Sequence, residues 1–171
     1  MSEGVSGKPI ALLIAALLIG AALFKWWPSD ERAVRRQLDN LADTITVPST
    51  DIDTARLTRL AELRNYFAPE ATVRLDVGEA LSRELLLALA ERWTPPPGGI
   101  FVEFVYGTIA IGDGTAAVDL TARISSRDPG SGEVTVDQRD ARFTLAKRER
   151  AWLITGVESV TLPGSPRPET R

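Results

Sequence analysis

The apolar residues of this chain follow two different periods, and the change from one to the other divides it. From Ser29 to about Trp93 they recur every three or four positions, which is the period of an amphipathic helix. After the break TPPPGG, which begins at Thr94, they recur at every second position, as in a half-buried strand. The pattern predicts helices first and a sheet afterwards, which is typical of an α+β fold.

Three helices are predicted in the first part. The first starts after Pro28 with Ser29 as its cap, the second covers about 53–66, and the third lies in EALSRELLLALAERW after Gly78. A short strand, ATVRLD at 71–76, separates the second helix from the third. The third helix is apolar over a wide face, so we expect it to pack on a sheet. The residues predicted to face the core are Val34, Leu38, Leu41 and Ile45, then Leu57, Leu60, Leu63 and Phe67, then Leu81, Leu85, Leu86, Leu89 and Trp93.

Four strands are predicted in the second part, joined by hairpin turns. Their sequences are IFVEFVYGTIAI, TAAVDLTARISS, VTVDQRDARFTLAKR and AWLITGVESV. The connections are GDG at 112–114, the longer loop RDPGSGE, and a charged turn at 147–150, while Gly107 and Gly156 are expected at β-bulges. We therefore expect a curved antiparallel sheet of one short strand plus a four-strand meander, packed on three helices that form a cone.

A long apolar segment precedes these elements. Every residue from Ile10 to Phe24 is apolar or glycine, and Lys25, Trp26 and Trp27 follow. A helix over 9–28 is close to the length that crosses a bilayer, and paired tryptophans beside a lysine are typical of its interface. A buried helix and a cleaved signal peptide are the alternatives, but bulky residues occupy the position where a cleavage site would lie. The predicted organisation is a tail at 1–8, a transmembrane helix at 9–28, one domain at 29–161 and a disordered tail at 162–171.

Composition narrows the possible chemistry. The 171 residues include no histidine and no cysteine, which excludes disulfides, thiol nucleophiles, cysteine-ligated zinc and histidine-dependent triads. The formal net charge is -3 and no basic stripe is present, so no nucleic-acid partner is expected. The GDG at 112–114 lacks the further ligands of a calcium or phosphate loop and indicates a hairpin turn. We expect no metal and no cofactor.

The order of the elements and the closing segment FTLAKRERAWLITGVESV carry a family resemblance. A penultimate strand, a charged turn and a strand with Trp152, Ile154 and Val157 resemble the ending of the nuclear transport factor 2-like superfamily, which includes SnoaL-like and ketosteroid-isomerase-like proteins. The resemblance covers roughly 29–161. It implies a cone whose open end can hold an apolar ligand, and it says little about function because the fold serves many activities.

The resemblance suggests where a site would lie. The aromatic residues expected near the cavity of the cone, where they either line it or fill it, are Tyr66, Trp93, Phe104, Tyr106 and Trp152. An isomerase-like pair would join Tyr66 or Tyr106 to Glu103 or Asp119, with a carboxylate pKa raised by apolar walls. Both carboxylates alternate with apolar neighbours, which favours a solvated outer face, so no catalytic residue is assigned.

An anchor followed by such a domain resembles two groups of envelope proteins in layout. These are the Mce-associated membrane proteins and the bitopic assembly factor of type IV secretion systems. The resemblance implies a non-enzymatic interaction domain on the extracytoplasmic side of the inner membrane, although the lysine and arginines after the anchor favour the cytoplasm. Its partners would be the bilayer, proteins of an envelope complex or a second copy, contacted through the sheet face and edges. This interpretation predicts a filled cone and an exposed apolar patch. The alternatives are a tethered module for a small apolar ligand and a carboxylate/tyrosine enzyme.

Overall fold

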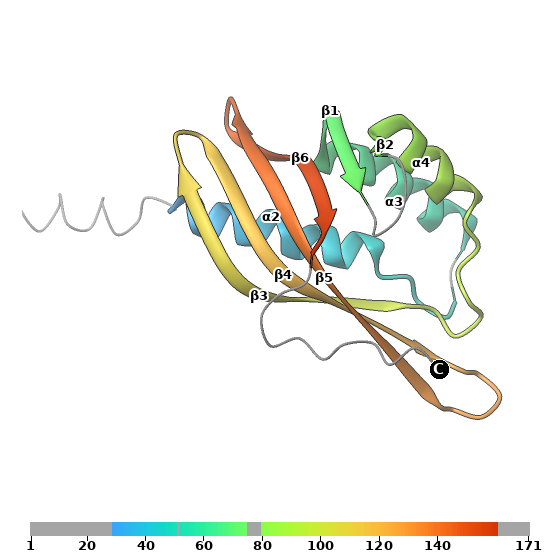
Figure 1. Cartoon of the computed structure of the whole chain (residues 1–171). Coiled ribbons are helices and arrows are strands. Elements are labelled where there is room, and N and C mark those ends of the chain that lie inside the picture. Colours follow the sequence, from blue (N-terminus) through green and yellow to red (C-terminus); the bar gives the residue numbers. More distant parts are fainter. Residues whose placement is uncertain (1–28, 51, 75–79, 161–171) are drawn as a thin grey trace, which may run out of the picture.

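The computed structural model describes residues 29–50, 52–74 and 80–160 (Figure 1). The predicted transmembrane helix, its interface residues Lys25, Trp26 and Trp27, and the tails at 1–8 and 162–171 lie outside the described residues. Within the described ranges, no helix is both long enough and apolar enough to cross a membrane. The prediction for 9–28 therefore stays a prediction.

Three helices and one mixed sheet make up the described part of the chain, which confirms the α+β class. The helices are α2 (Asp30–Ile45), α3 (Asp53–Tyr66) and α4 (Arg83–Arg92). The strands are β1 (Phe67–Arg74), β2 (Leu81–Ser82), β3 (Phe101–Gly112), β4 (Thr115–Arg127), β5 (Val134–Arg148) and β6 (Ala151–Ser159). Their order across the sheet is β2-β1-β6-β5-β4-β3.

The predicted meander is confirmed. Strands β3 to β6 pair with their neighbours in sequence, all antiparallel. The pairing of β3 with β4 shifts register between Tyr106 and Ile109, where Gly107 was expected at a bulge. The pairing of β5 with β6 shifts beside Gly156. At the GDG turn, Asp113 and Gly114 both have positive φ angles (47° and 73°), as a tight two-residue hairpin requires.

The pairing of β1 corrects the prediction of a wholly antiparallel sheet. β1 runs parallel to β6, with Val73 beside Val157, and antiparallel to the short β2, which the sequence did not reveal. β1 also starts earlier than predicted, at Phe67, which therefore belongs to a strand and not to the helix before it. Pro69 is accommodated because the ladder with β6 is irregular between Phe67 and Thr72.

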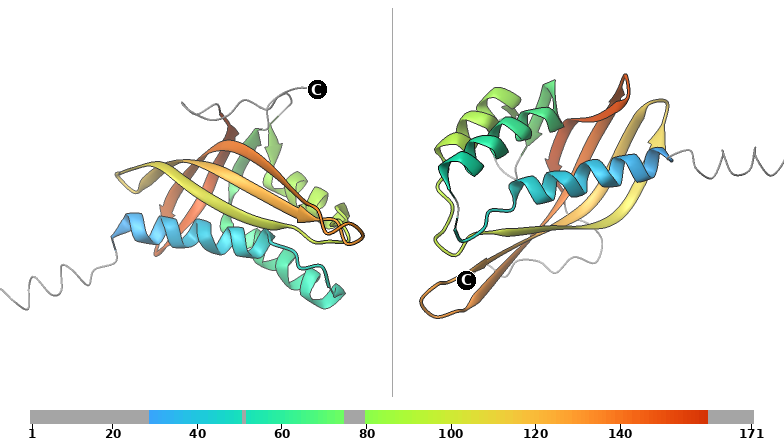
Figure 2. Two further views of the ribbon diagram at one scale, coloured as in Figure 1. Left: turned by 90° about the horizontal axis from the view of Figure 1, so that it is seen from below. Right: turned by 180° about the vertical axis from the view of Figure 1, so that it is seen from behind.

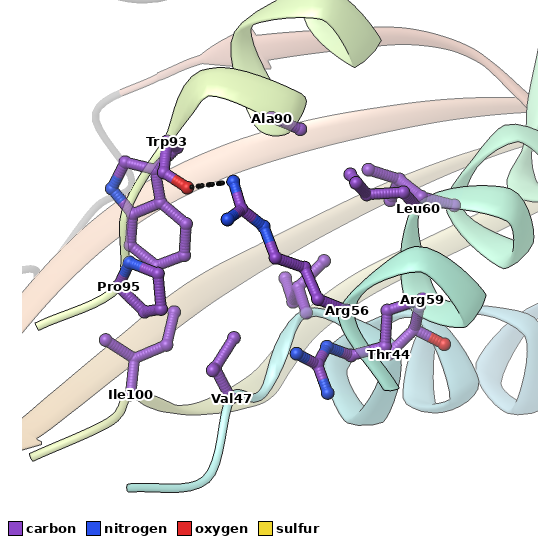
Figure 3. Close-up of a pocket in the computed structure, with 11 residues that line it drawn as sticks. Thr44, Val47, Arg56, Arg59, Leu60, Ala90, Trp93, Pro95 and Ile100 are labelled. Atoms are coloured by element: carbon purple, nitrogen blue, oxygen red, sulfur yellow. Dashed lines mark hydrogen bonds between the residues drawn. The ribbon is translucent and has the colours of Figure 1, made fainter. Parts of the chain in front are cut away.

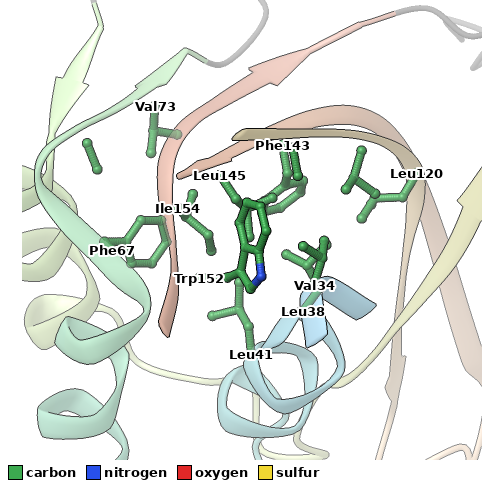
Figure 4. Packing of buried hydrophobic residues seen from close by; sticks show 13 residues of the cluster. Val34, Leu38, Leu41, Phe67, Val73, Leu120, Phe143, Leu145, Trp152 and Ile154 are labelled. Atoms are coloured by element: carbon green, nitrogen blue, oxygen red, sulfur yellow. The ribbon is translucent and has the colours of Figure 1, made fainter. Parts of the chain in front are cut away.

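Helix α2 lies across one face of the sheet, which we call the inner face (Figures 1 and 2). Ser29 caps its start by accepting a hydrogen bond from the Arg32 backbone N–H at 3.4 Å. Its predicted apolar face is confirmed, because Val34, Leu38 and Leu41 are buried against the inner face. The sheet residues of this core include Val118, Leu120, Phe143, Leu145, Trp152 and Ile154 (Figure 4).

Helices α3 and α4 depart from the predicted faces. Leu57 of α3 is 68% exposed. Leu85 and Leu89 of α4, and Trp93 directly after its last turn, are also about half exposed. The buried leucine of α4 is Leu87, and its neighbour Leu86 packs on the core. The prediction was wrong because the run LLLALA places apolar residues on all sides of the helix, so its periodicity does not select one face.

Candidate functional site

The interior of the cone between α2 and the sheet is filled by side chains. Trp152 is buried at its centre, with its ring against Leu145 and Phe143 and its Nε1 facing α2 (Figure 4). Nε1 has no hydrogen-bond partner among the described residues. Phe104 packs on Phe143 with ring centroids 5.6 Å apart. Two of the five aromatic candidates, Phe104 and Trp152, are therefore part of the core packing rather than of a ligand cavity.

Tyr106 lies on β3, where this strand contacts α2. Its hydroxyl lies 2.6 Å from Oδ1 of Asp39, to which it donates, and 3.2 Å from the Arg35 carbonyl oxygen. The Arg35 guanidinium lies 4.8 Å from the ring centroid. Burial, and then the hydrogen bond to Asp39, raise the pKa of Tyr106 above its usual range, so the phenol stays protonated at neutral pH. The carboxylate beside this tyrosine is thus Asp39, which the sequence did not single out.

Tyr66, at the end of α3, ties that helix to α2. Its hydroxyl lies 2.9 Å from Thr44 Oγ1 and donates to the Asn40 carbonyl oxygen at 3.2 Å. These contacts join the C-terminal end of α3 to α2. Tyr66 is partly buried against the core. Through Thr44 it contacts one wall of the pocket described below.

Glu103 and Asp119 lie on the other, outer face of the sheet. Glu103 pairs with Arg123 at 3.1 Å, and Asp119 receives two hydrogen bonds from Arg142, at 2.7 and 3.0 Å. Hydrogen bonding from Arg142 lowers the pKa of the Asp119 carboxyl, so it is ionised at neutral pH. The structure therefore does not bring either carboxylate to Tyr66 or Tyr106, and the isomerase-like arrangement considered above is not formed by these residues.

An apolar pocket of about 170 Å³ opens between the C-terminal end of α2, α3, the end of α4 and the segment that enters β3 (Figure 3). Trp93 is the one aromatic candidate that lines it. The pocket lies beside the cone and not inside it, because side chains of the core fill the interior of the cone. The lining residues are Thr44, Ile45, Val47, Arg56, Arg59, Leu60, Leu63, Ala90, Trp93, Pro95 and Ile100.

Backbone and side-chain hydrogen bonds hold the walls of this pocket in place. Val47 and Ile100 exchange backbone hydrogen bonds of 2.9 and 2.8 Å, which join the end of α2 to the start of β3. Arg56 donates from Nη2 to the carbonyl oxygens of Glu91 and Trp93, the latter at 3.0 Å (Figure 3). A cation at these carbonyls also balances the negative end of the α4 dipole. Arg56 thus fixes the end of α4 and the Trp93 beside it.

A row of exposed apolar side chains runs along α4, next to the pocket. Leu85, Leu89 and Trp93 follow at i, i+4 spacing and are 48%, 47% and 45% exposed. We call these three residues the α4 stripe. The outer face of the sheet differs, since ion pairs cover its middle and exposed Phe101, Val105, Val134 and Val136 lie towards β3 and the β4–β5 hairpin.

The sequence pointed to Trp93 but missed the arginines of the pocket. Arg56 and Arg59 stand one helical turn apart on α3, and Leu60 and Leu63 follow the same face. Two arginines at this spacing between inward-facing leucines are a detectable signal, although surface helices often carry the same pattern. Among the described residues, no group of acidic side chains is arranged to hold a metal ion.

The comparisons with known proteins address the fold. No protein-family model matches the chain, and no curated protein matches it either. Among solved structures, it is similar to a nuclear transport factor 2-like protein with a cystatin-like fold from Novosphingobium aromaticivorans, with a TM-score of 0.63 at 12% identity over 96% of this chain and 94% of that one. The chain thus has a nuclear transport factor 2-like, cystatin-like α+β fold.

Two further solved structures show how widely this fold is used. The association domain of CaMKII from C. elegans matches with a TM-score of 0.62 at 13% identity, over 78% of this chain and 96% of that one. The protein Aln2 from a Streptomyces species matches with a TM-score of 0.60 at 15% identity, over 78% of this chain and 91% of that one. At these identities the likeness shows the fold alone.

Proposed function

We propose that this chain is a non-enzymatic interaction module, anchored in a membrane by residues 9–28 and serving a larger complex of the cell envelope. The observation that carries the proposal is the α4 stripe. Leu85, Leu89 and Trp93 remain about half exposed in one row, so a partner that covered them would gain about half of the roughly 1.5–3 kcal/mol that complete burial of such a side chain is worth. A continuous exposed apolar row is typical of a contact surface.

We assign the proposed contact surface to the α4 stripe, and not to the sheet face and edges that the sequence led us to expect. The middle of the outer sheet face already satisfies its charges internally, since Asp119 pairs with Arg142 and Glu103 with Arg123. A partner would have to displace or cover these ion pairs at a desolvation cost. The α4 stripe has no such cost, because its side chains are apolar, and the other side of α4 packs in the domain through Leu87.

The filled cone supports an interaction role over catalysis. Trp152 and Phe104 occupy the space between α2 and the sheet, where an enzyme of this fold would place its substrate. The tyrosine–carboxylate pair of the described residues, Tyr106 with Asp39, is used to join α2 to β3. The apolar run from Ile10 to Phe24, followed by Trp26 and Trp27, supports the anchor. The extracytoplasmic side is proposed from the resemblance in layout to the two groups of envelope proteins described above.

Photo-cross-linking in native membranes tests this proposal. A photoreactive amino acid at Leu89 is expected to capture a heavier protein product that also depends on Leu85 and Trp93. The matched control is the same amino acid at Glu62, an exposed polar position on α3. Capture at neither position, capture at both alike, or recovery of the chain only by itself would contradict the proposal. Release of the intact chain by carbonate without detergent would contradict the anchor.

A further inference from the structure

Strand β5 is longer than β6 beside it, so part of one side of β5 has no neighbouring strand in the described chain. β5 pairs with β4 over 134–146, but with β6 only over 141–148. The contact with the β6 side continues as far as a hydrogen bond from the Val160 N–H to the Asp140 carbonyl oxygen, at 3.1 Å. Over 134–138, no described strand lies on this side of β5.

The backbone of this part of β5 offers hydrogen-bond donors and acceptors to a further strand. Successive residues of a strand direct their N–H and C=O groups to opposite sides. The Asp140 carbonyl oxygen faces β6, whereas the Lys147 N–H donates at 2.7 Å to the turn before β4. Even-numbered residues of β5 therefore face the β6 side, and Val134, Val136 and Gln138 present both backbone groups there. We call these three residues the β5 edge. An open strand edge is a template for pairing with another chain.

The β5 edge is accessible and partly apolar. Every residue over 134–139 is exposed, and the β4–β5 hairpin extends past the helices and the other strands (Figures 1 and 2). Val134 and Val136 are 49% and 50% exposed. Val136 lies in one row of the outer face with Ser125 and the exposed Phe101, because Ser125 pairs with both. A strand added at the β5 edge would extend this row as well as the sheet.

The β5 edge is complementary to itself in one antiparallel register. A two-fold axis at Val136 pairs this residue with Val136 of a second copy, and pairs Val134 with Gln138 in both directions. All three edge residues then exchange backbone hydrogen bonds. An axis at position 134 or 138 would leave some of them opposite the hairpin turn or opposite the part of β5 that β6 already covers.

The charged residues favour the same register. With the axis at Val136, Glu133 of one copy lies opposite Arg139 of the other, and Asp137 lies opposite Thr135. Arg139 can keep its ion pair with Asp137 of its own strand, at 3.1 Å, because both lie on the same face of β5. An axis at position 137 would place Asp137 opposite Asp137, and an axis at 135 would place it opposite Glu133. Like charges directly opposite each other destabilise a strand pair.

From this match we infer that the β5 edge binds a second copy of this chain, by antiparallel β5–β5 pairing about Val136. The pairing joins the sheets of the two copies into one continuous sheet. The interface is separate from the α4 stripe, which lies on a helix, and it does not depend on the stripe having a partner. The photo-cross-linking at Leu89 and the disulfide experiment below therefore fail independently.

Single cysteines test the pairing, because the chain has none of its own. Val136→Cys, in the full-length chain in native membranes, is expected to give a disulfide-linked product of twice the mass of the chain on mild oxidation. Hydrogen-bonded neighbours hold their Cα atoms about 5.5 Å apart, which a disulfide can bridge. The matched control is Val105→Cys, an outer-face valine of β3 that is 41% exposed. No more product from Val136→Cys than from Val105→Cys would overturn the inference.

Pairs of variants test the register. Chains with Val134→Cys and chains with Gln138→Cys are expected to cross-link when they are expressed together, and neither should exceed the Val105→Cys control by itself. Asp137→Cys should link to itself about tenfold less than Val136→Cys, because residue 137 lies opposite Thr135 in this register. Equal linking of Asp137→Cys and Val136→Cys would indicate another register and would contradict the inference.

A proline variant tests the backbone hydrogen bonds. Val136→Pro removes an N–H of the β5 edge but none that bonds to β4, so it should reduce linking between the position 134 and 138 cysteines about tenfold. Val136→Thr keeps the N–H and should retain the linking. Undiminished linking in the proline variant would contradict the inference. So would linking of Val136→Cys that appears only after residues 162–171 are removed, because the C-terminal segment of the chain itself would then cover the edge.

Discussion

Helices α2 and α4 show two ways in which apolar residues are distributed on a helix of this domain. α2 buries Val34, Leu38 and Leu41 on one face and carries charged residues on the other. α4 buries Leu87 and presents Leu85, Leu89 and Trp93 to solvent on the opposite side. Burial in the domain accounts for the apolar face of α2 but only for part of the apolar residues of α4. The difference separates residues that the fold requires from residues that are available for binding.

The largest expected effect is at the centre of the α2 face. Leu38→Ala removes a side chain with no exposed surface, and we expect it to lower the free energy of unfolding by about 2–5 kcal/mol, because a cavity remains in a packed core. Leu89→Ala on α4 is the matched control and should change it by about 0.5 kcal/mol or less. Urea denaturation followed by far-ultraviolet circular dichroism measures both. Equal losses in the two variants would mean that α4 packs on both faces and would break the comparison.

A smaller effect is expected at the start of α4. Ser82 Oγ accepts a hydrogen bond from the Leu85 N–H at 3.3 Å, and Ser82→Ala should cost about 0.5–2 kcal/mol. Because α4 has few residues and few buried side chains, we expect the loss to appear mainly as faster amide hydrogen exchange within α4. Ser82→Thr keeps the cap and is the control. Uniform acceleration across α2 and α4 would show that α4 does not open separately.

The smallest effect concerns the polar edge of α2 and appears only at high pH. Below about pH 10 Tyr106 is protonated in both the folded and the unfolded chain, so its contribution is fully present. Above that pH the unfolded chain loses the phenol proton while the folded chain retains it, because the pKa of Tyr106 is raised by burial and by Asp39. The melting temperature should therefore fall as pH rises past about 10.

Two variants separate the causes of this fall in melting temperature at high pH. Tyr106→Phe removes the ionisable group, so the fall above about pH 10 should be shallower than in the parent chain. Asp39→Asn removes the carboxylate and keeps the burial, so it should reduce the fall only in part, because burial is the larger cause. Thermal melts at intervals between about pH 8 and 11 measure the slopes on both sides of the usual tyrosine pKa. Parallel slopes in all three chains would show that Tyr106 does not contribute.

The same contrast explains which parts of the fold could be predicted. The face of α2 was predictable because arginine and aspartate separate its apolar residues. The buried face of α4 was not predictable, because consecutive leucines and alanines put apolar side chains on several sides of the helix. The meander was predictable from alternation and turns, including the bulge at Gly107. The parallel pairing of β1 with β6 was not, because it joins strands far apart in sequence and no local pattern records it.

The candidate site was predictable only in outline. Trp93 was named as one of the aromatic residues expected near the cavity of the cone, and the structure places it in the wall of the pocket beside the cone. Trp152 and Phe104 have the same chemistry but fill the core, and sequence does not distinguish an aromatic residue that lines a space from one that occupies it. Arg56 and Arg59 were missed because the rotation of α3 about its own axis decides which of its residues line the pocket, and the sequence does not give that rotation.

The place of β6 in the sheet has a consequence for the synthesis of this protein. β6 is the last of the described strands to leave the ribosome, yet it lies between β1 and β5 and is the neighbour that joins them. Until it emerges, the nascent chain holds two separate pieces, β1 with β2 on one side and β3 to β5 on the other, each with an open edge. Loss of β6 would leave both pieces without their common neighbour, so a premature stop near Arg150 should yield a chain that is degraded rather than a shortened domain.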